Sequence, residues 1–446
     1  MLVVISSCND NKQGEKISTD ITFVEIAPII YNNCTNCHRP NAAGPFSLAN
    51  YEEIKRKSKT IVKVTQSRYM PPWPADPTYS NFKDEKILSQ QEIDQIKIWV
   101  DNGCPIGDSS KISTAPVYPD GSQIGVPDMV IKFPEIQLKG NKEDHFFLVK
   151  VPYEMPTDKY VRTIEFIPGN KKAVHHMNAN LIEYEPGKKK SVFGGEKIIP
   201  TNLAVGAEDV QTAMDNKNDD GTYPALVPLV CNYLPGVSPA IYPEGIGGFK
   251  MSKQGVFFIN DLHFGPLPRD TVDSNSVLNI FFDVAPPRRP TYEILLGSLG
   301  VAPVKPALII PAGEIKTFTI DYQVQDDMSI LTINPHMHLI GTKFLAYATT
   351  PKGDTIPLIR INKWDFRWQY FYTFKKMLHI PAGSNIHVEG TYNNTSKNVN
   401  NPFFPPQVII DRGNRFDSMK TTNEMLQFII TYLPYQKGDE DVRLGE

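Results

Sequence analysis

The segment YNNCTNCHRP, residues 31–40, contains the spacing C-x-x-C-H, which is formed by Cys34, Cys37 and His38. In this spacing two thiols can form thioethers to a haem while the adjacent histidine binds the iron, so the motif predicts covalent c-type haem. The alternative is a redox or zinc cysteine pair, and zinc would need two further ligands. Between residues 20 and 110 the sequence offers only Cys104 as another cysteine or histidine, which favours haem.

Met70 is the candidate for the second axial ligand of that iron. It stands in RYMPPW, residues 68–73, where two prolines restrict the preceding backbone to extended conformations and could direct the thioether at the iron. A single methionine is more often a core residue. Ligation by histidine and methionine raises the reduction potential and closes the iron to dioxygen, so this haem is expected to transfer electrons.

Five further histidines have spacings that suit a metal. His175 and His176 are adjacent, His263 lies in DLHFGP, and His336 and His338 form H-x-H. Residues i and i+2 of a strand share a face, so the H-x-H pair could bind one metal, whereas the adjacent pair could do so only at a bulge or strand end. Imidazoles suit copper, zinc, iron or nickel, and an added thioether shifts the preference toward Cu(I). Taken alone, each pair is also typical of surface or core histidines.

Two kinds of element would position these residues. Helical spacing predicts helices near 27–33, over 50–66, and after Ser89, where Ser89 and Glu92 fit a capping box. From about residue 127, short β-branched and aromatic runs alternate with turn residues, which predicts antiparallel sandwiches. The clearest runs are HFFLVKVP (145–152), GVFFINDLHF (255–264), SVLNIFFDV (276–284) and NIHVEGTYNN (385–394).

The composition is that of a multidomain globular protein. A chain of 446 residues suggests two to four domains, and its formal net charge of -3 gives no basic field for nucleic acid. The start MLVVISSC resembles the end of a bacterial lipoprotein signal, which predicts a lipid anchor at Cys8 and a periplasmic or cell-surface location. A chance apolar start with a free cysteine is the alternative. No other segment is apolar enough to be a transmembrane helix.

Four separated motifs follow one another along the larger part of the chain. They are H-H-M at 175–177, L-H-F-G at 262–265, H-x-H-L-x-G at 336–341 and T-N-E-M at 422–425. This succession resembles the copper type II, ascorbate-dependent monooxygenases, the family of peptidylglycine α-hydroxylating monooxygenase and dopamine β-monooxygenase. The resemblance covers roughly residues 127–437 and includes WDFRWQ at 364–369.

The resemblance implies a multidomain fold class, in which a small all-α cytochrome c domain precedes two all-β jelly-roll sandwich domains. The expected divisions are a signal remnant and tether at 1–20, the cytochrome c domain at 21–112, and the N-terminal and C-terminal copper monooxygenase domains at 113–286 and 287–446.

The resemblance also implies two copper sites. His175, His176 and His263 match the family's electron-storing site, and His336, His338 and Met425 match its oxygen-binding site. Met419 competes with Met425, but Glu-Met at 424–425 matches the motif better. The remaining histidines match no ligand motif and are expected to be structural; they are His145, His379 and His387.

The expected activity is hydroxylation of a C–H bond of a small organic substrate with O2. The haem c would pass electrons to the two coppers, and the external reductant would be ascorbate or a redox protein. Fusion raises the effective concentration of such a donor at the copper sites. Two alternatives are a non-catalytic electron-transfer or copper-binding protein on the same fold, and a chain that keeps the haem but binds zinc or no metal in its body.

Some positions depart from the peptide hydroxylase. Asn334 stands where that enzyme has a carboxylate-binding arginine, and Gln427 and Ile429 replace an asparagine and a tyrosine, so a glycine-extended peptide is not the expected substrate. Most of the family's disulfides are also missing, since Cys104 and Cys231 could form one at most.

Overall fold

The structure is a computed structural model that describes residues 19–119, 121–201, 206–413 and 420–445. It divides into two compact units. Of the described residues, the first unit comprises Thr19–Pro40, Gly44–Pro72 and Lys86–Val117. The second unit comprises Asn41–Ala43, Trp73–Glu85 and Tyr118–Glu446. The predicted lipid anchor at Cys8 lies outside the described residues.

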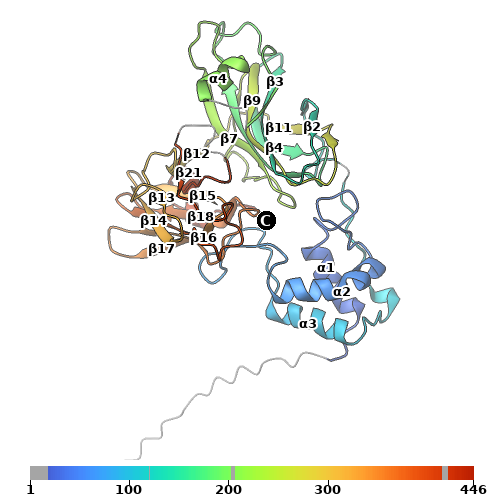
Figure 1. The fold of residues 1–446 in the computed structure, drawn as a ribbon. Coiled ribbons are helices and arrows are strands. Elements are labelled where there is room, and N and C mark those ends of the chain that lie inside the picture. Colours follow the sequence, from blue (N-terminus) through green and yellow to red (C-terminus); the bar gives the residue numbers. More distant parts are fainter. Residues whose placement is uncertain (1–18, 120, 202–205, 414–419, 446) are drawn as a thin grey trace, which may run out of the picture. The chain divides into compact units, whose positions relative to one another are not determined.

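The first unit contains three helices, which lie together in Figure 1: α1 (Phe23–Asn33), α2 (Tyr51–Gln66) and α3 (Gln90–Asp101). The capping box at Ser89 is confirmed, because its side chain accepts from the Glu92 N–H while the Glu92 carboxylate accepts from the Ser89 N–H. All three predicted helices are present. Their buried residues form one core, in which Ile26, Ile54 and Trp99 are fully or almost fully inaccessible.

Helix α1 begins earlier than the sequence predicts. Thr22 and Glu25 form a second capping box, which fixes the start at Phe23 and leaves Pro28 beyond the first turn. Pro28 has no backbone N–H and cannot donate a helical hydrogen bond, which disfavours this longer helix. Burial of Phe23 and Ile26 in the core outweighs that cost.

The second unit is built from antiparallel strands. The strands are β1 (Met129–Lys132), β2 (Ile136–Leu138), β3 (His145–Glu154), β4 (Lys159–Ile167), β5 (Val174–Glu183), β6 (Ile198–Pro200), β7 (Ala225–Tyr233), β8 (Phe249–Met251), β9 (Gln254–Phe264), β10 (Thr271–Asp273), β11 (Val277–Asp283), β12 (Tyr292–Gly297), β13 (Ile309–Ile310), β14 (Ile315–Gln323), β15 (Met328–His336), β16 (Gly341–Thr349), β17 (Thr355–Ile361), β18 (Tyr372–Ile380), β19 (Asn385–Asn393), β20 (Ile409–Ile410) and β21 (Gln427–Pro434). The four strand runs quoted above correspond to β3, β9, β11 and β19, so these predictions are confirmed.

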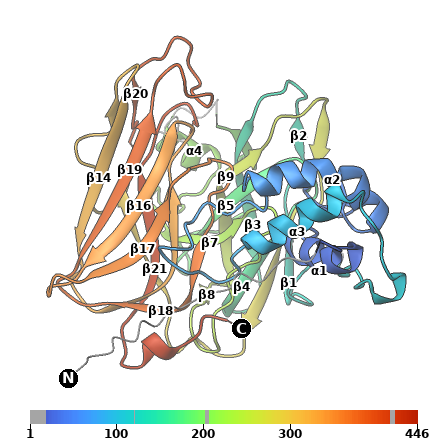
Figure 2. The ribbon, with the colours of Figure 1, turned by 90° about the horizontal axis from the view of Figure 1, so that it is seen from below.

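These strands form six sheets. The strands before Pro286 make the sheets β6-β3-β9-β5-β7, β1-β11-β4-β8 and β10-β2, and those after it make β12-β21-β15-β18, β14-β19-β16-β17 and β13-β20. Figure 2 shows β14, β19, β16 and β17 side by side in one of them. We call the two groups of sheets the first and second halves of the β unit, and each half encloses its own apolar core.

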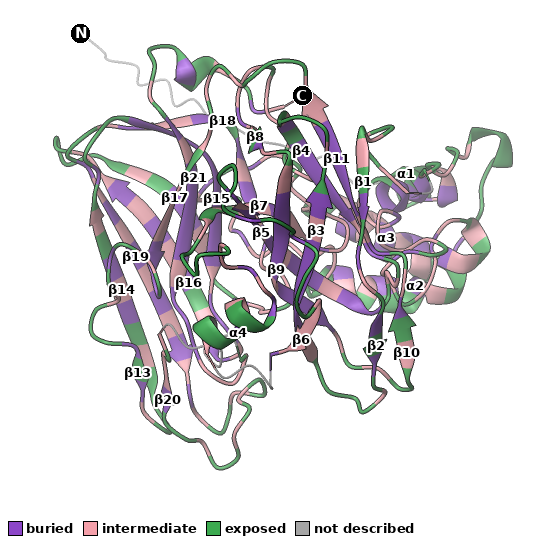
Figure 3. Cartoon of the chain, turned by 90° about the horizontal axis from the view of Figure 1, so that it is seen from above, coloured by how far each residue is buried: buried purple, intermediate pink, exposed green. Residues whose placement is uncertain are grey.

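Burial follows the strands closely. Figure 3 shows long buried stretches along β3, β5 and β9, whereas the short helix α4 (Ala207–Ala213) is largely exposed. Strand β9 is inaccessible at most positions because it is the central strand of its sheet and is covered on both faces.

The predicted fold class, an all-α cytochrome c domain followed by two all-β jelly-roll domains, is wrong. The chain is mostly β, with 36% strand and 12% helix. Residues 21–112 are not a self-contained all-α domain, because Trp73–Glu85 belongs to the second unit. The rest of the chain forms one compact unit of six sheets, and it also carries helix α4.

We call Trp73–Glu85 the strap, since it lies between α2 and α3 in sequence but is built into the β unit. Ala75 forms an isolated antiparallel bridge with Ile361, and Phe82 forms another with Phe374. Phe82 is completely buried. The strap therefore pairs with β17 and β18 and contributes to the core of the second half.

Side chains hold the strap as well. The Trp73 ring lies 5.4 Å from that of Tyr370, and Arg360 donates from Nε to the Asp76 carboxylate at 2.9 Å. The Asp76 carboxyl is little exposed, so this ion pair is less screened by water than a surface pair. Among the residues described, no helix has the length and apolar character needed to cross a membrane.

Candidate functional site

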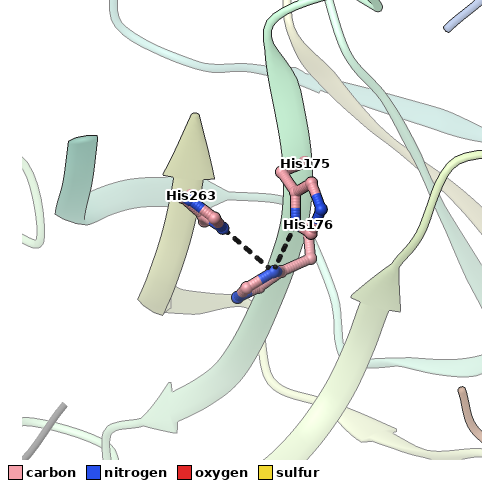
Figure 4. A group of neighbouring side chains, drawn as sticks. All are labelled: His175, His176 and His263. Carbon is pink, nitrogen blue, oxygen red and sulfur yellow. Dashed lines mark hydrogen bonds between the residues drawn. The ribbon is translucent and has the colours of Figure 1, made fainter. Parts of the chain in front are cut away.

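A β-bulge brings the first histidine group together. The pairing of β5 with β9 shifts register between Val174 and His176, so His175 is the extra residue. Its side chain can then lie beside that of His176, and His263 faces both from β9. His176 Nδ1 is 3.2 Å from His175 Nδ1 and 3.3 Å from His263 Nδ1, as the dashed lines of Figure 4 mark. The bulge that the adjacent histidines required is thus present.

Two carboxylates set the proton positions in this group. His176 Nε2 lies 2.8 Å from Asp261 Oδ2, and His263 Nε2 lies 2.7 Å from Asp144 Oδ1. A carboxylate accepts, so each Nε2 carries the proton and each Nδ1 presents a lone pair toward the other histidines. Converging lone pairs repel one another unless a cation lies among them, and carboxylates behind metal-binding imidazoles serve to orient them.

Two of the three histidines in this group, His175 and His263, are held neutral. Burial, with the neighbouring His176 and His263, lowers the pKa of His175 to about 2, and burial also lowers the pKa of His263. Neutral imidazole is the form that binds metals. The donor set of three imidazoles therefore fits a copper or zinc ion.

The second histidine group lies at the end of β15. His336 is the last residue of that strand, and its ring centroid is 5.0 Å from that of His338. His338 donates from Nδ1 to the Asn423 carbonyl at 3.1 Å, which leaves Nε2 free to bind a metal. Burial lowers the pKa of His336 to about 3 and that of His338 to about 4, so both are neutral at pH 7.

Glu424 ties the segment that carries Met425 to this group. Its buried carboxyl group accepts the backbone N–H of His338 and of Ile340, each at 2.8 Å. The Tyr392 hydroxyl donates to the Met425 carbonyl at 2.7 Å, and Met425 is itself buried. The structure thus joins the predicted methionine segment to the H-x-H segment. The competing Met419 lies outside the described residues.

A small cavity adjoins both groups. His176 and His336 contribute to its wall, and most of the other lining side chains are carboxamides or aromatic rings, with no Lys, Arg, Asp or Glu among them. Asn334 is one of the carboxamides and donates to the Tyr370 carbonyl at 2.9 Å. The lining residues are His176, Asn178, Asn232, Tyr233, Leu234, Asn334, His336, Gln369 and Phe371.

The C-x-x-C-H motif lies in the first unit, directly after α1. Cys34 caps the helix, and its carbonyl accepts the N–H groups of Cys37 and His38. Both thiols are free. His38 Nδ1 lies 3.0 Å from the Phe46 carbonyl oxygen, which must accept from it, so Nε2 is left available for a metal. These features fit attachment of a haem.

Gly44 allows the loop to close over His38. A Cβ at this position would lie 2.7 Å from the Cys37 carbonyl oxygen and 2.8 Å from His38 Nδ1, so a side chain would force the loop away. Met70 belongs to the same unit, where its N–H donates to the Val64 carbonyl at 3.1 Å.

The remaining cysteines and histidines have local roles. Cys104 and Cys231 are both buried free thiols in different units, so the disulfide left open from the sequence is not formed. His145 is hydrogen-bonded to a backbone carbonyl, His379 stacks on a tyrosine and His387 faces two carboxylates.

Reasoning from the sequence missed the acidic partners. Asp261 precedes His263 by two residues in DLH and so shares its face of β9, a signal that could have been used. Asp144 and Glu424 reach their partners across long sequence separations, which no local pattern reveals.

Comparisons with known proteins add no assignment. No protein-family model and no curated protein matches the chain. A solved structure of the infectious bursal disease virus Gx strain is 10% identical and covers 72% of this chain and 77% of that chain, with a TM-score of 0.17. The VP2 subviral particle of that virus is also 10% identical, covers 72% of this chain and 87% of that chain, and has a TM-score of 0.15. Scores this low carry no argument about fold or function.

Proposed function

We propose that this chain is a copper-dependent monooxygenase that hydroxylates a C–H bond of a small organic substrate with O2, and that a covalently attached c-type haem in the same chain supplies it with electrons. The observation that carries the proposal is the convergence of three imidazole Nδ1 atoms, from His175, His176 and His263, in the same compact unit as the His336 and His338 pair.

The two histidine groups differ in their ligand sets, and this difference would suit one copper that stores an electron and another that binds O2. Three imidazoles accept both Cu(II) and Cu(I), whereas two imidazoles with the Met425 thioether favour Cu(I). Copper bound at these sites would supply one-electron transfer and dioxygen activation. Asp261 and Asp144 would keep the imidazoles of the first group oriented and correctly protonated. Glu424 would hold the backbone of the second.

The cavity itself has room for about one water molecule, so only the chemistry of its lining side chains bears on the substrate. Its carboxamides offer hydrogen bonds but no charge, and Asn334 cannot replace an arginine as the partner of a carboxylate. A neutral polar substrate suits these groups better than a carboxylate-bearing peptide.

His38, with its Nδ1 fixed by the Phe46 carbonyl, and Met70 would hold the haem iron. A haem held there would supply one-electron transfer, with ascorbate or a redox protein as the external reductant. A haem attached through thioethers and a lipid-modified Cys8 would both be consistent with a periplasmic or cell-surface location.

The test combines metal content with oxygen chemistry. We expect one covalent haem and two coppers per chain after copper loading, and substrate-dependent oxygen uptake when neutral polar compounds are screened. In single turnover, the haem of the reduced protein should be oxidised in step with product formation, and much more slowly in His175→Ala. Equal haem oxidation in copper-free protein would show that the haem reacts independently and would contradict the electron-relay part of the proposal.

A further inference from the structure

The ring of Phe366 contacts histidines of both groups. Its centroid lies 6.2 Å from that of His176 and 6.4 Å from that of His263, both in the first half. It also lies 5.8 Å from the centroid of His338, in the second half. Such separations are typical of packed aromatic rings. One side chain therefore touches both candidate metal sites.

A well-defined turn presents this ring. The Trp368 N–H donates to the Asp365 carbonyl at 2.9 Å, and the Arg367 N–H donates to the Asp365 carboxylate at 3.1 Å. The Arg367 guanidinium also pairs with that carboxylate. Gln369 closes the turn from the other side by donating to the Phe366 carbonyl at 3.0 Å. Phe366 is consequently placed by several hydrogen bonds.

The turn is anchored to the second histidine group. The Trp364 indole N–H donates to the His338 carbonyl at 3.2 Å, and the Trp364 backbone N–H donates to the Thr342 carbonyl at 2.8 Å. The base of the turn is thus fixed beside His338, while its apex contacts His176 and His263. A displacement of either half would have to move the ring.

We infer that Phe366 is a positioning residue that fixes the distance between the two metal sites, an inference that rests on the proposed function. Phenylalanine has no ligand atom and no hydrogen-bonding group, so the ring fills space without competing for a metal.

The test uses the full chain loaded with two Cu(II) ions and measures the copper–copper distance by pulsed electron paramagnetic resonance. The wild type should give a narrow distribution. Phe366→Ala should broaden it or shift it to longer distances, and Phe366→Leu should give a smaller change of the same kind because it retains part of the apolar volume. Phe404→Ala removes a ring that is 90% exposed and serves as the matched control, with the wild-type distribution expected.

The copper content of each variant separates a failure of the role inferred for Phe366 from a failure of the proposed function. Two coppers per chain with an unchanged distribution in both Phe366 variants would overturn the role of Phe366 and leave the proposed function intact. Fewer than two coppers in the wild type would overturn both. If Phe366→Ala does not fold, the smaller change expected in Phe366→Leu decides the question.

Discussion

Asp261 Oδ2 lies 2.8 Å from His176 Nε2, and both side chains are almost completely buried. Burial alone would raise the pKa of Asp261, but the interaction with the neighbouring His176 opposes it, and the net effect lowers this pKa. The carboxylate is therefore ionised and fixes the proton on Nε2. A negative charge this close to three imidazoles is stabilised further when a cation binds them.

Asp261→Asn should weaken copper binding at the first histidine group by about 10- to 100-fold, because the orienting charge is lost while the shape is kept. Competition with a chromophoric chelator measures this affinity. Asp158→Asn removes a surface carboxylate that pairs with Lys250 and should leave copper affinity unchanged. Equal effects of both variants would mean that net charge, and not the contact with His176, governs binding.

Met425→Leu tests the thioether at the second group. Leucine has nearly the same volume, so the cost to folding stability should stay below about 1.5 kcal/mol, whereas alanine at this buried position would cost about 2–5 kcal/mol. Cu(I) retention at this group and hydroxylation should both be lost. Met337→Leu replaces a buried methionine between the two histidines and should preserve both. Loss of Cu(I) in Met337→Leu instead would assign the ligand to that residue.

Met70→Ala should open the haem iron to carbon monoxide and lower its reduction potential. The absorption spectrum of the reduced protein with and without carbon monoxide, together with a redox titration, measures both effects. An unchanged spectrum and potential would show that another residue binds the iron.

Glu293 should make stability depend on pH. Burial raises its pKa to about 8, and its Oε2 has no hydrogen-bond partner. The folded state then binds more protons than the unfolded state between about pH 4.5 and pH 8, so this group lowers stability as pH rises, by at most about 1.4 kcal/mol per pH unit. Glutamine cannot ionise, so the melting temperature of Glu293→Gln should rise relative to that of the wild type as the pH is increased from 5.5 to 8.

The matched control for this prediction is Glu154→Gln, at the exposed end of β3. Its melting temperature should follow that of the wild type at every pH. A difference between Glu293→Gln and the wild type that does not change with pH would contradict the ionisation of Glu293.

Local patterns predicted much of this structure. The Ser89 capping box located α3, and the spacing of His175 and His176 required the bulge that β5 contains. These features depend on residues close together in sequence, where hydrogen-bond geometry and strand alternation leave few choices. The predicted fold class was wrong because nothing local shows that Phe82 pairs with Phe374 and joins the β unit.

The candidate site was predictable to a similar extent. The histidines could be identified from their spacing, but Asp144, Phe366 and Glu424 act through contacts that span long stretches of chain. Such contacts depend on how the two halves of the β unit pack together, and the periodicity of side chains along the sequence does not predict that packing.

Because of the strap, the segment that carries the C-x-x-C-H motif cannot be removed from this chain without taking away part of the β unit. A recombinant fragment that starts at residue 113 would lack Phe82 and Asp76, leaving a gap in the apolar core beside Phe374 and an unpaired Arg360. Such a fragment should aggregate or be cleaved rapidly by proteases, and a synthetic peptide of residues 73–85 added during refolding should restore it. The order of the helical segment and the β segment along this chain therefore does not correspond to two separable pieces.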